Sequence, residues 1–251
     1  MTKRIAIAGK GGTGKTTLAA LLIRLLQENH PQKAILAVDA DPNANLNEAL
    51  GLEVEQTMAD VLEAIKRPGG VPTGMTKDIF VQYELNRSLV ETDHYDLLVM
   101  GNPQGPGCYC YPNDLLRRFL EQLSANYDYM LMDNEAGLEH LSRRVLPEAE
   151  ILLVTSDATA RGIRSAGRVH EIIDHLKLKF ERMGLVISRS RPDELERLRE
   201  EIARTGLEVW GEIPFDHTIM DFDLEGKPLF ELPDSSPAVQ AVAKLYQALA
   251  L

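Results

Sequence analysis

The chain has 251 residues and a formal net charge of −11 at pH 7, with 44% hydrophobic and 26% charged residues. This composition is that of a globular protein large enough to bury a sizeable core, and the negative charge argues against nucleic acid as a partner, because phosphate binding needs clustered Lys and Arg. The longest apolar stretch, residues 18–26, contains Arg24 and is too short to cross a membrane, so we expect no membrane partner either.

The first residues do not resemble a signal peptide, because Lys3 and Arg4 lead directly into an apolar strand. The chain also has only two cysteines, which is too few for a disulfide framework. We therefore expect a cytoplasmic protein.

Apolar runs that alternate with amphipathic stretches predict one α/β domain over residues 1–251. Strands are expected at residues 4–8, 34–38, 96–101, 129–133, 151–155, 184–187 and 209–213. Helices are expected at residues 14–28, 44–50, 57–66, 113–126 (capped by Asn113 or Asp114), 160–179, 192–205 and 237–250, and residues 78–89 are ambiguous. Apolar strands that alternate with helices form parallel sheets, so we expect a mostly parallel sheet of about seven strands covered by helices on both faces.

The first strand leads into a glycine-rich loop, residues 9–17, with the sequence GKGGTGKTT. The spacing G-x-x-x-x-G-K-[ST] between a strand and a helix is that of a P-loop, whose backbone N–H groups hold phosphates at the helix N-terminus. We expect the whole loop, from Gly9 through Thr13 to Thr17, to bind a nucleotide. Lys15 is expected to contact the β- and γ-phosphates, and Thr16 to bind Mg²⁺. The alternative is a glycine-rich turn without a ligand.

Lys10 stands beside the first glycine, where the P-loop pattern does not require a lysine. Such a cation either faces solvent or stabilises charge on the γ-phosphate, in its own subunit or in a partner's, as an arginine finger does. The pattern K-G-G-x-G-K-T-T resembles the deviant P-loop of dimeric ATPases, a group that includes the nitrogenase iron protein, the Min and Par positioning ATPases and metal-centre maturation ATPases. In that group the early lysine crosses the dimer interface, so the resemblance implies a homodimer in which Lys10 is catalytic.

Two acids, Asp39 and Asp41, follow the second strand and precede Pro42. Ligands of an open parallel sheet bind beyond the carboxyl ends of its strands, so we expect both acids near the P-loop. One would position or deprotonate the attacking water and the other would support Mg²⁺. We assign the water to Asp41, because it lies further from the strand. The alternative is an Asx-type turn before the proline.

Cys108 and Cys110 are the only cysteines and lie in a loop rich in Gly and Pro. A disulfide across one residue is strained, so free thiols are expected. Two thiolates fill half of a tetrahedral metal site, and a second copy related by a two-fold axis supplies the other half. Zn²⁺, Ni²⁺, Cu⁺ and an iron–sulfur cluster all suit such ligands. The alternative is two small apolar side chains packed in the core.

Asp133 ends the apolar strand 129–133 and is followed by Asn134, Glu135, Ala136 and Gly137. An acid at the end of a buried strand suits a Walker B role, in which it holds Mg²⁺ directly or through water. Gly137 is expected to offer its backbone N–H to the γ-phosphate. The alternative for Asp133 is the N-cap of a helix.

Three segments narrow the resemblance: DADPNANL from residue 39, CYC at 108–110 and DNEAGLEHL from residue 133. In this order, and with the P-loop, they resemble the nickel-insertion ATPases that mature carbon monoxide dehydrogenase and acetyl-CoA synthase. The resemblance implies an ATP-dependent homodimer that binds Ni²⁺, or Zn²⁺ in its place, through Cys108 and Cys110 and delivers nickel to such a client enzyme. It also implies that Asp41 serves hydrolysis and that Asp133 lies near Mg²⁺. The residues that it assigns to ATP are Lys10, Gly11, Gly12, Gly14, Lys15, Thr16 and Thr17.

The chain departs from these relatives at Ser188 and Arg189, where they usually have Asn-Lys to read adenine; residues 213–216 are candidates to share that role. Two other functions stay open. One is an electron donor with a [4Fe–4S] cluster that bridges the dimer, which a second loop acid in place of Asn45 would have favoured. The other is a positioning ATPase that binds membrane or DNA through a basic helix, although residues 238–251 carry only Lys244 as a basic residue.

Overall fold

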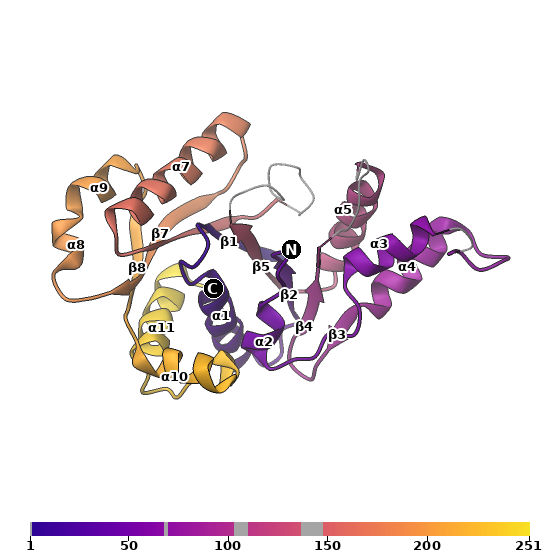
Figure 1. Ribbon diagram of the computed structural model, residues 1–251, viewed down its shortest axis with the longest axis horizontal. Coiled ribbons are helices and arrows are strands. Elements are labelled where there is room, and N and C mark those ends of the chain that lie inside the picture. Colours follow the sequence, from indigo (N-terminus) through magenta and orange to yellow (C-terminus); the bar gives the residue numbers. More distant parts are fainter. Residues whose placement is uncertain (1, 68–69, 103–109, 137–147) are drawn as a thin grey trace.

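The computed structural model describes residues 2–67, 70–102, 110–136 and 148–251, with the backbone alone for residues 110–116 and 136. An eight-stranded sheet runs through the middle of the molecule (Figure 1) in the order β3-β4-β2-β5-β1-β6-β7-β8. Its strands are β1 (Lys3–Gly9), β2 (Ile35–Ala40), β3 (Leu89–Glu91), β4 (Asp96–Val99), β5 (Tyr129–Ala136), β6 (Ile151–Asp157), β7 (Arg182–Ser190) and β8 (Val209–Pro214).

All of these strands pair in parallel except β3, which lies antiparallel to β4 at one edge. The parallel strands therefore all end at the same side of the sheet. In the centre, β5 lies between β1 and β2, so the residues that follow these strands come close together. The predicted fold class is confirmed: the chain is a single α/β unit with a mostly parallel sheet.

Helices cover both faces of the sheet. They are α1 (Lys15–Asn29), α2 (Leu46–Leu50), α3 (Met58–Lys66), α4 (Lys77–Arg87), α5 (Cys110–Ser124), α7 (Ala160–Leu176), α8 (Glu194–Arg197), α9 (Arg199–Arg204), α10 (His217–Glu225) and α11 (Pro237–Leu249), with a short 3-10 helix at Leu229–Glu231. Successive side chains of a strand point to opposite faces, and β1 shows this directly. Ile5 and Ile7 pack with α1, α2 and α11, whereas Ala6 and Ala8 pack with α3, α4, α5 and α7. In Figure 1, α3, α4 and α5 lie at one end of the molecule and α7, α8 and α9 at the other.

Four sequence-based expectations need correction. The sheet has eight strands rather than about seven, because residues 78–89 divide between α4 and the edge strand β3. Helix α5 begins at Cys110 rather than after a cap at residue 113 or 114, since Pro112 falls in the first turn, where a helix tolerates proline. Residues 192–205 form two short helices, because the backbone leaves the helical region at Leu198. Helix α10 was not anticipated.

Candidate nucleotide-binding site

The P-loop joins β1 to α1, and two of its glycines have a physical reason to be glycine. A Cβ on Gly9 would lie 2.3 Å from Oγ1 and 2.5 Å from the carbonyl oxygen of Thr155 on β6, so no larger residue fits there. Gly14 is the N-cap of α1 and has a left-handed backbone with φ 81°, a conformation that costs an L-residue free energy. The loop thus requires glycine for close approach and for backbone direction.

Hydrogen bonds from two neighbouring strands hold the loop from behind. The Thr13 side chain is buried; its Oγ1 lies 2.7 Å from the carbonyl oxygen of Lys10 and 2.7 Å from Oγ1 of Thr155. The Ser188 hydroxyl at the end of β7 is 2.8 Å from the carbonyl oxygen of Thr13, to which it donates. The loop is therefore fixed to β6 and β7 in the conformation that exposes its inner side.

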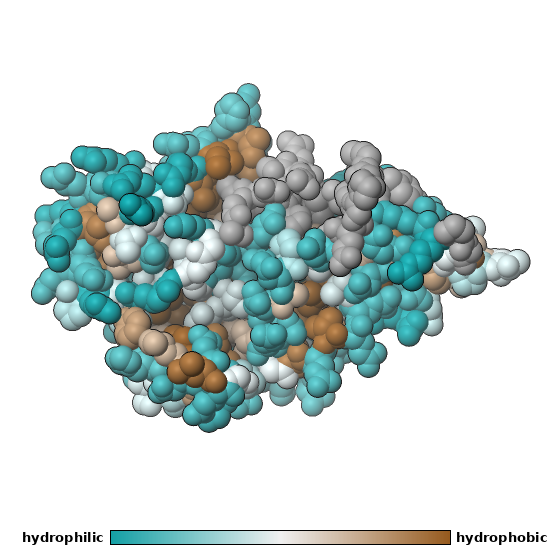
Figure 2. Space-filling view, in the orientation of Figure 1, coloured by the Kyte–Doolittle hydropathy of each residue, from teal (hydrophilic) through white to brown (hydrophobic). Residues whose placement is uncertain are grey.

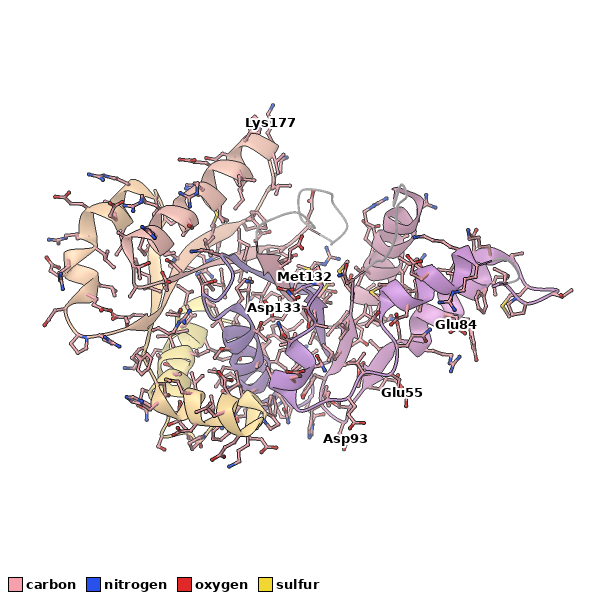
Figure 3. All side chains as sticks on the ribbon, viewed as in Figure 1. Glu55, Glu84, Asp93, Met132, Asp133 and Lys177 are labelled. Atoms are coloured by element: carbon pink, nitrogen blue, oxygen red, sulfur yellow. The ribbon has the colours of Figure 1, made fainter. Side chains whose placement is uncertain are left out.

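Asp133 meets the P-loop through Thr16. The Thr16 hydroxyl donates a 2.7 Å hydrogen bond to Oδ2 of Asp133, and Oδ1 of Asp133 has no hydrogen-bond partner among the residues that the structure describes. The Asp133 side chain is almost completely buried and lies near the middle of the molecule (Figure 3). Burial raises the pKa of this carboxyl to about 7; the hydrogen bond from Thr16 opposes the rise and the nearby Asp39 adds to it. A buried acid with a spare oxygen beside a hydroxyl is a suitable place for a cation.

Asp39 and Asp133 are register partners on the adjacent strands β2 and β5. Asp39 is fully buried, and burial raises its pKa to about 6 although backbone hydrogen bonds oppose the rise. Its two oxygens accept hydrogen bonds from backbone N–H groups, at 3.0 Å from Asp41 and at 2.9 Å from Leu46. Asp39 therefore shapes the turn after β2.

Asp41 is only half-buried, and both interpretations of the sequence, a turn before the proline and a group in the nucleotide site, agree with its position. Its Oδ1 accepts hydrogen bonds from the backbone and side-chain nitrogens of Asn43, both at 2.9 Å, which is an Asx-type turn. The same residue lines the pocket at the P-loop. The turn thus holds Asp41 at the edge of the site, where the sequence predicts the group that activates water.

These residues fit a bound Mg²⁺, which prefers oxygen ligands. The free Oδ1 of Asp133 and the Thr16 hydroxyl belong to a donor set of the right kind, at the N-terminus of α1. When bound, Mg²⁺ would supply positive charge that neutralises the phosphates. Strand β5 holds this carboxylate in place, and the first turn of α1 holds the hydroxyl.

A pocket of about 720 Å³ opens in front of the P-loop and extends away from it. Its loop end is lined by Gly11, Gly12, Gly14, Lys15, Thr16 and Thr17, and Lys15 is 94% buried there, since its relative exposure is 6%. Ser188, Arg189 and the segment from Ile213 to Asp216 also line it. The structure thus brings the segments at 188–189 and 213–216, considered for base recognition, onto one wall with the P-loop.

Helix α10 supplies residues to this pocket that the sequence did not reveal, namely Ile219, Met220 and Asp223. Apolar side chains show at the surface over α10 in Figure 2, where Met220 and Leu224 are exposed. The sequence signal for this helix was Asp216, a good N-cap residue, whose side chain accepts a hydrogen bond from the Thr218 N–H and so caps the helix. A helix with no buried residue carries no apolar period by which to recognise it.

Lys10 lies apart from the residues around this pocket. Its side chain is exposed and does not line the pocket of its own chain. An exposed lysine at this position is compatible with the contact to a partner's nucleotide that the resemblance implies.

Three further predicted residues, Cys108, Cys110 and Gly137, belong to the two segments that contain undescribed residues. Cys108 and Gly137 lie outside the described residues, and Cys110 is the first residue of α5. The chain reaches this segment from β4, and the Met100 N–H donates a 2.8 Å hydrogen bond to the Asp39 carbonyl oxygen. Within the described ranges, no three His, Cys, Asp or Glu side chains form a metal-binding group, and no helix is long and apolar enough to span a bilayer.

Comparison with known proteins gives consistent matches along the whole chain. Residues 5–229 match the CobQ/CobB/MinD/ParA nucleotide binding domain family. An uncharacterized ATP-binding protein of Methanocaldococcus jannaschii is 39% identical over 244 residues, which cover 96% of each chain. The carbon monoxide dehydrogenase accessory protein CooC of Rhodospirillum rubrum is 29% identical over 262 residues, which cover 99% of this chain and 96% of CooC. The solved structure of the MinD cell division protein of Aquifex aeolicus is similar with a TM-score of 0.72 and 25% identity, covering 99% of this chain and 97% of MinD.

Proposed function

Because this chain belongs to the CobQ/CobB/MinD/ParA nucleotide-binding family, we propose that it is an ATP-dependent, homodimeric nickel-insertion protein for carbon monoxide dehydrogenase or acetyl-CoA synthase. It is an ATPase, as its family and its P-loop indicate. The additional step in the proposal is the cargo: Ni²⁺, or Zn²⁺ in its place, bound by Cys108 and Cys110. The similarity to a carbon monoxide dehydrogenase accessory protein over nearly the whole chain supports this step.

The observation that supports the proposal is that the chain runs from the nucleotide site into the segment that contains Cys108 and Cys110. Strand β4 pairs with β2 in parallel, so the residues after β4 start at the same side of the sheet as Asp39 and the P-loop. The Met100 N–H donates a 2.8 Å hydrogen bond to the Asp39 carbonyl oxygen, and the Met100 carbonyl oxygen accepts a 2.9 Å hydrogen bond from the Ala59 N–H. A shift of the backbone at Asp39 therefore acts directly on Met100, from which the chain continues to the cysteines.

The dimer connects ATP to the metal. Each chain supplies two thiolates, half of the four ligands of a tetrahedral site, and the second copy completes it. Lys10 extends to the partner's nucleotide. For ATP to favour the closed dimer, it must bind the closed dimer more tightly than the open one. In the proposed cycle, Asp41 positions water for hydrolysis, and opening of the dimer changes the geometry of the thiolates and releases nickel.

The proposal is tested by nickel titration of the reduced protein without oxygen, with and without Mg-ATP. We expect about one Ni²⁺ per two chains, because the site needs both copies. The double variant Cys108→Ser/Cys110→Ser should bind no nickel. As a matched control, Lys15→Ala keeps both thiols and should bind nickel without a response to ATP. Nickel binding that persists in the double variant would contradict the proposal.

A positioning ATPase is the second candidate, favoured by the similarity to MinD. Helix α11 weighs against its membrane-binding form. Its buried residues Val239, Val242 and Leu245 pack in the core with α1, and Lys244 is its only basic residue. Co-sedimentation with anionic lipid vesicles or DNA in the presence of ATP distinguishes the two, since the nickel-insertion protein should stay in the supernatant.

A further inference from the structure

Arg189 occupies a strained position at the end of β7. The register of β7 on β8 pairs Ser188 with Ile213 and Ser190 with Pro214, so Arg189 is an extra residue in a β-bulge. Its φ of 55° is in the left-handed region, which costs an arginine free energy that a glycine would not lose. Bulges commonly redirect a side chain next to an active site, and strain of this kind clusters at functional sites.

The bulge brings the Arg189 side chain to the P-loop. Its Nη2 lies 3.9 Å from the position that a Cβ on Gly12 would occupy, and both residues line the pocket. The preceding residue fixes this arrangement, because the Ser188 hydroxyl donates to the Thr13 carbonyl oxygen at 2.8 Å. The guanidinium thus lies beside the phosphate-binding backbone, on its β7 side.

The charges around the pocket make this guanidinium important for binding an anionic ligand. Among the described residues, the lining contains four acids, Asp41, Glu48, Asp216 and Asp223, and two bases, Lys15 and Arg189. Lys15 lies near the buried Asp133 and interacts with it electrostatically. The Arg189 side chain is exposed and makes no hydrogen bond or ion pair with the part of the chain that the structure describes. Arg189 is therefore the described basic side chain of the pocket whose charge no protein group neutralises.

We propose that Arg189 is a second phosphate-binding cation of the nucleotide site, which donates hydrogen bonds to the phosphate chain from the β7 side of the P-loop. This inference rests on the proposed use of the pocket for ATP. In this arrangement Arg189 contacts the phosphates rather than the base. The site therefore selects nucleotides by the charge of their phosphates. A guanidinium presents several N–H donors in a fixed plane that matches phosphate oxygens.

The test compares Arg189→Gly, Arg189→Lys and Arg197→Ala, with binding of adenosine, ADP and ATP measured by competition against a fluorescent nucleotide. Arg197 is a matched control, because it is also an exposed arginine but lies on α8 and does not line the pocket. Arg189→Gly should weaken ADP and ATP binding about 10- to 100-fold, as expected for loss of a charge-assisted hydrogen bond. Adenosine binding should not change, Arg189→Lys should lose less affinity, and Arg197→Ala should resemble the wild type.

Two further readouts separate binding from folding. The melting temperature of Arg189→Gly should equal or exceed that of the wild type, because glycine accepts the left-handed backbone. The affinity for ADP should also depend less on salt than in the wild type, since one charge pair is lost.

Unchanged affinities for ADP and ATP in Arg189→Gly would overturn the inference and leave the proposed ATPase intact. An equal loss for adenosine would also overturn it, because Arg189 would then contact the nucleoside. A wild-type protein that binds neither ADP nor ATP would overturn the proposed function, and with it the inference.

Discussion

The Thr16 hydroxyl donates a 2.7 Å hydrogen bond to Oδ2 of Asp133, which joins the first turn of α1 to β5. This bond connects the P-loop with an acid of the strand next to β1, and Asp39 is the register partner of Asp133 on β2, the strand on the other side of β5. Two buried carboxylates in register repel each other when both are ionised. A cation beside Thr16 would relieve this repulsion, so the arrangement favours binding of Mg-nucleotide.

Asp133→Asn keeps the shape of the side chain but removes its charge. We expect the affinity for Mg-ATP to fall at least about tenfold and hydrolysis to fall about 100-fold, because a charged oxygen ligand of Mg²⁺ is lost. Binding assays with Mg²⁺ and with EDTA check this expectation. The loss should appear with Mg²⁺ and be small in EDTA; an equal loss in both conditions would mean that Asp133 acts without the metal.

The same variant gives a pH signature in the metal-free protein. The pKa of Asp133 is raised from 3.8 in the unfolded chain to about 7 in the fold, chiefly by burial. Between these values the folded protein binds more protons than the unfolded chain, so its free energy of unfolding falls as the pH rises. Denaturation in EDTA from pH 5 to 8 should show a steeper loss for the wild type than for Asp133→Asn. Parallel curves would contradict the assigned shift.

Gly9→Ala tests the close approach of the P-loop to β6. Its Cβ would lie 2.5 Å from the Thr155 backbone oxygen, so the strands must separate, and we expect a loss of roughly 3 kcal/mol in stability. This corresponds to a melting temperature lower by about 6–12 °C for a chain of this size. Gly167→Ala in α7 is the control, because its Cβ would make ordinary contacts at 3.5 Å with Thr205. Gly167→Ala should be more stable than the wild type. If Gly9→Ala were as stable as the wild type, the close packing of Gly9 on Thr155 would not matter for stability.

Asp216 caps two helices and so fixes one wall of the pocket. Its oxygens accept hydrogen bonds from the Thr218 N–H at 2.8 Å, the Ser236 hydroxyl at 2.5 Å and the Ala238 N–H at 3.1 Å. Asp216→Ala should cost about 2 kcal/mol of stability, about 1 kcal/mol for each cap, and should weaken ATP binding, because Phe215 and Ile219 line the pocket. Chemical denaturation and nucleotide titration measure both effects. Asp221→Ala, an exposed position on the same helix, should change neither.

Mixing two inactive variants tests whether Lys10 acts across a dimer. Lys10→Ala lacks the lysine that we propose serves the partner, and Asp41→Ala lacks the acid that we propose activates water in its own site. In a mixed dimer, one site receives both groups, so an equal mixture should recover about a quarter of the wild-type ATPase rate. No recovery, in a mixture shown by sedimentation to contain dimers, would place Lys10 in its own subunit's site.

Much of this architecture could be predicted from the sequence, because nearly continuous apolar runs identify buried strands and the P-loop pattern identifies its own strand, loop and helix. Residues 78–89 were ambiguous for a physical reason. In α4, Val81 and Leu85 are buried while Ile79 and Tyr83 are exposed, so apolar residues lie on both faces and give no clear period. Edge strand β3 has only three residues, too few to show alternation.

The site was predictable where a local pattern sets the chemistry and not where the tertiary structure sets it. Lys15, Thr16 and Asp133 follow from their motifs, and the structure brings them together. The position of Arg189 depends on the bulge between β7 and β8, which no local pattern indicates. Likewise, Asp39 accepts a hydrogen bond from the Leu46 N–H, seven residues further along the chain. Spacing alone did not distinguish this structural role from metal binding.

The most direct test of nickel insertion is the activity of a purified nickel-free carbon monoxide dehydrogenase after incubation with this protein, Ni²⁺ and Mg-ATP. We predict activity well above that obtained with Ni²⁺ alone. We also predict no gain with Lys15→Ala, which keeps both thiols but lacks the lysine assigned to the β- and γ-phosphates. With acetyl-CoA synthase as the client, the same comparison applies. Failure of the wild-type protein to activate either client, or equal activation by Lys15→Ala, would contradict the proposal that ATP drives nickel delivery.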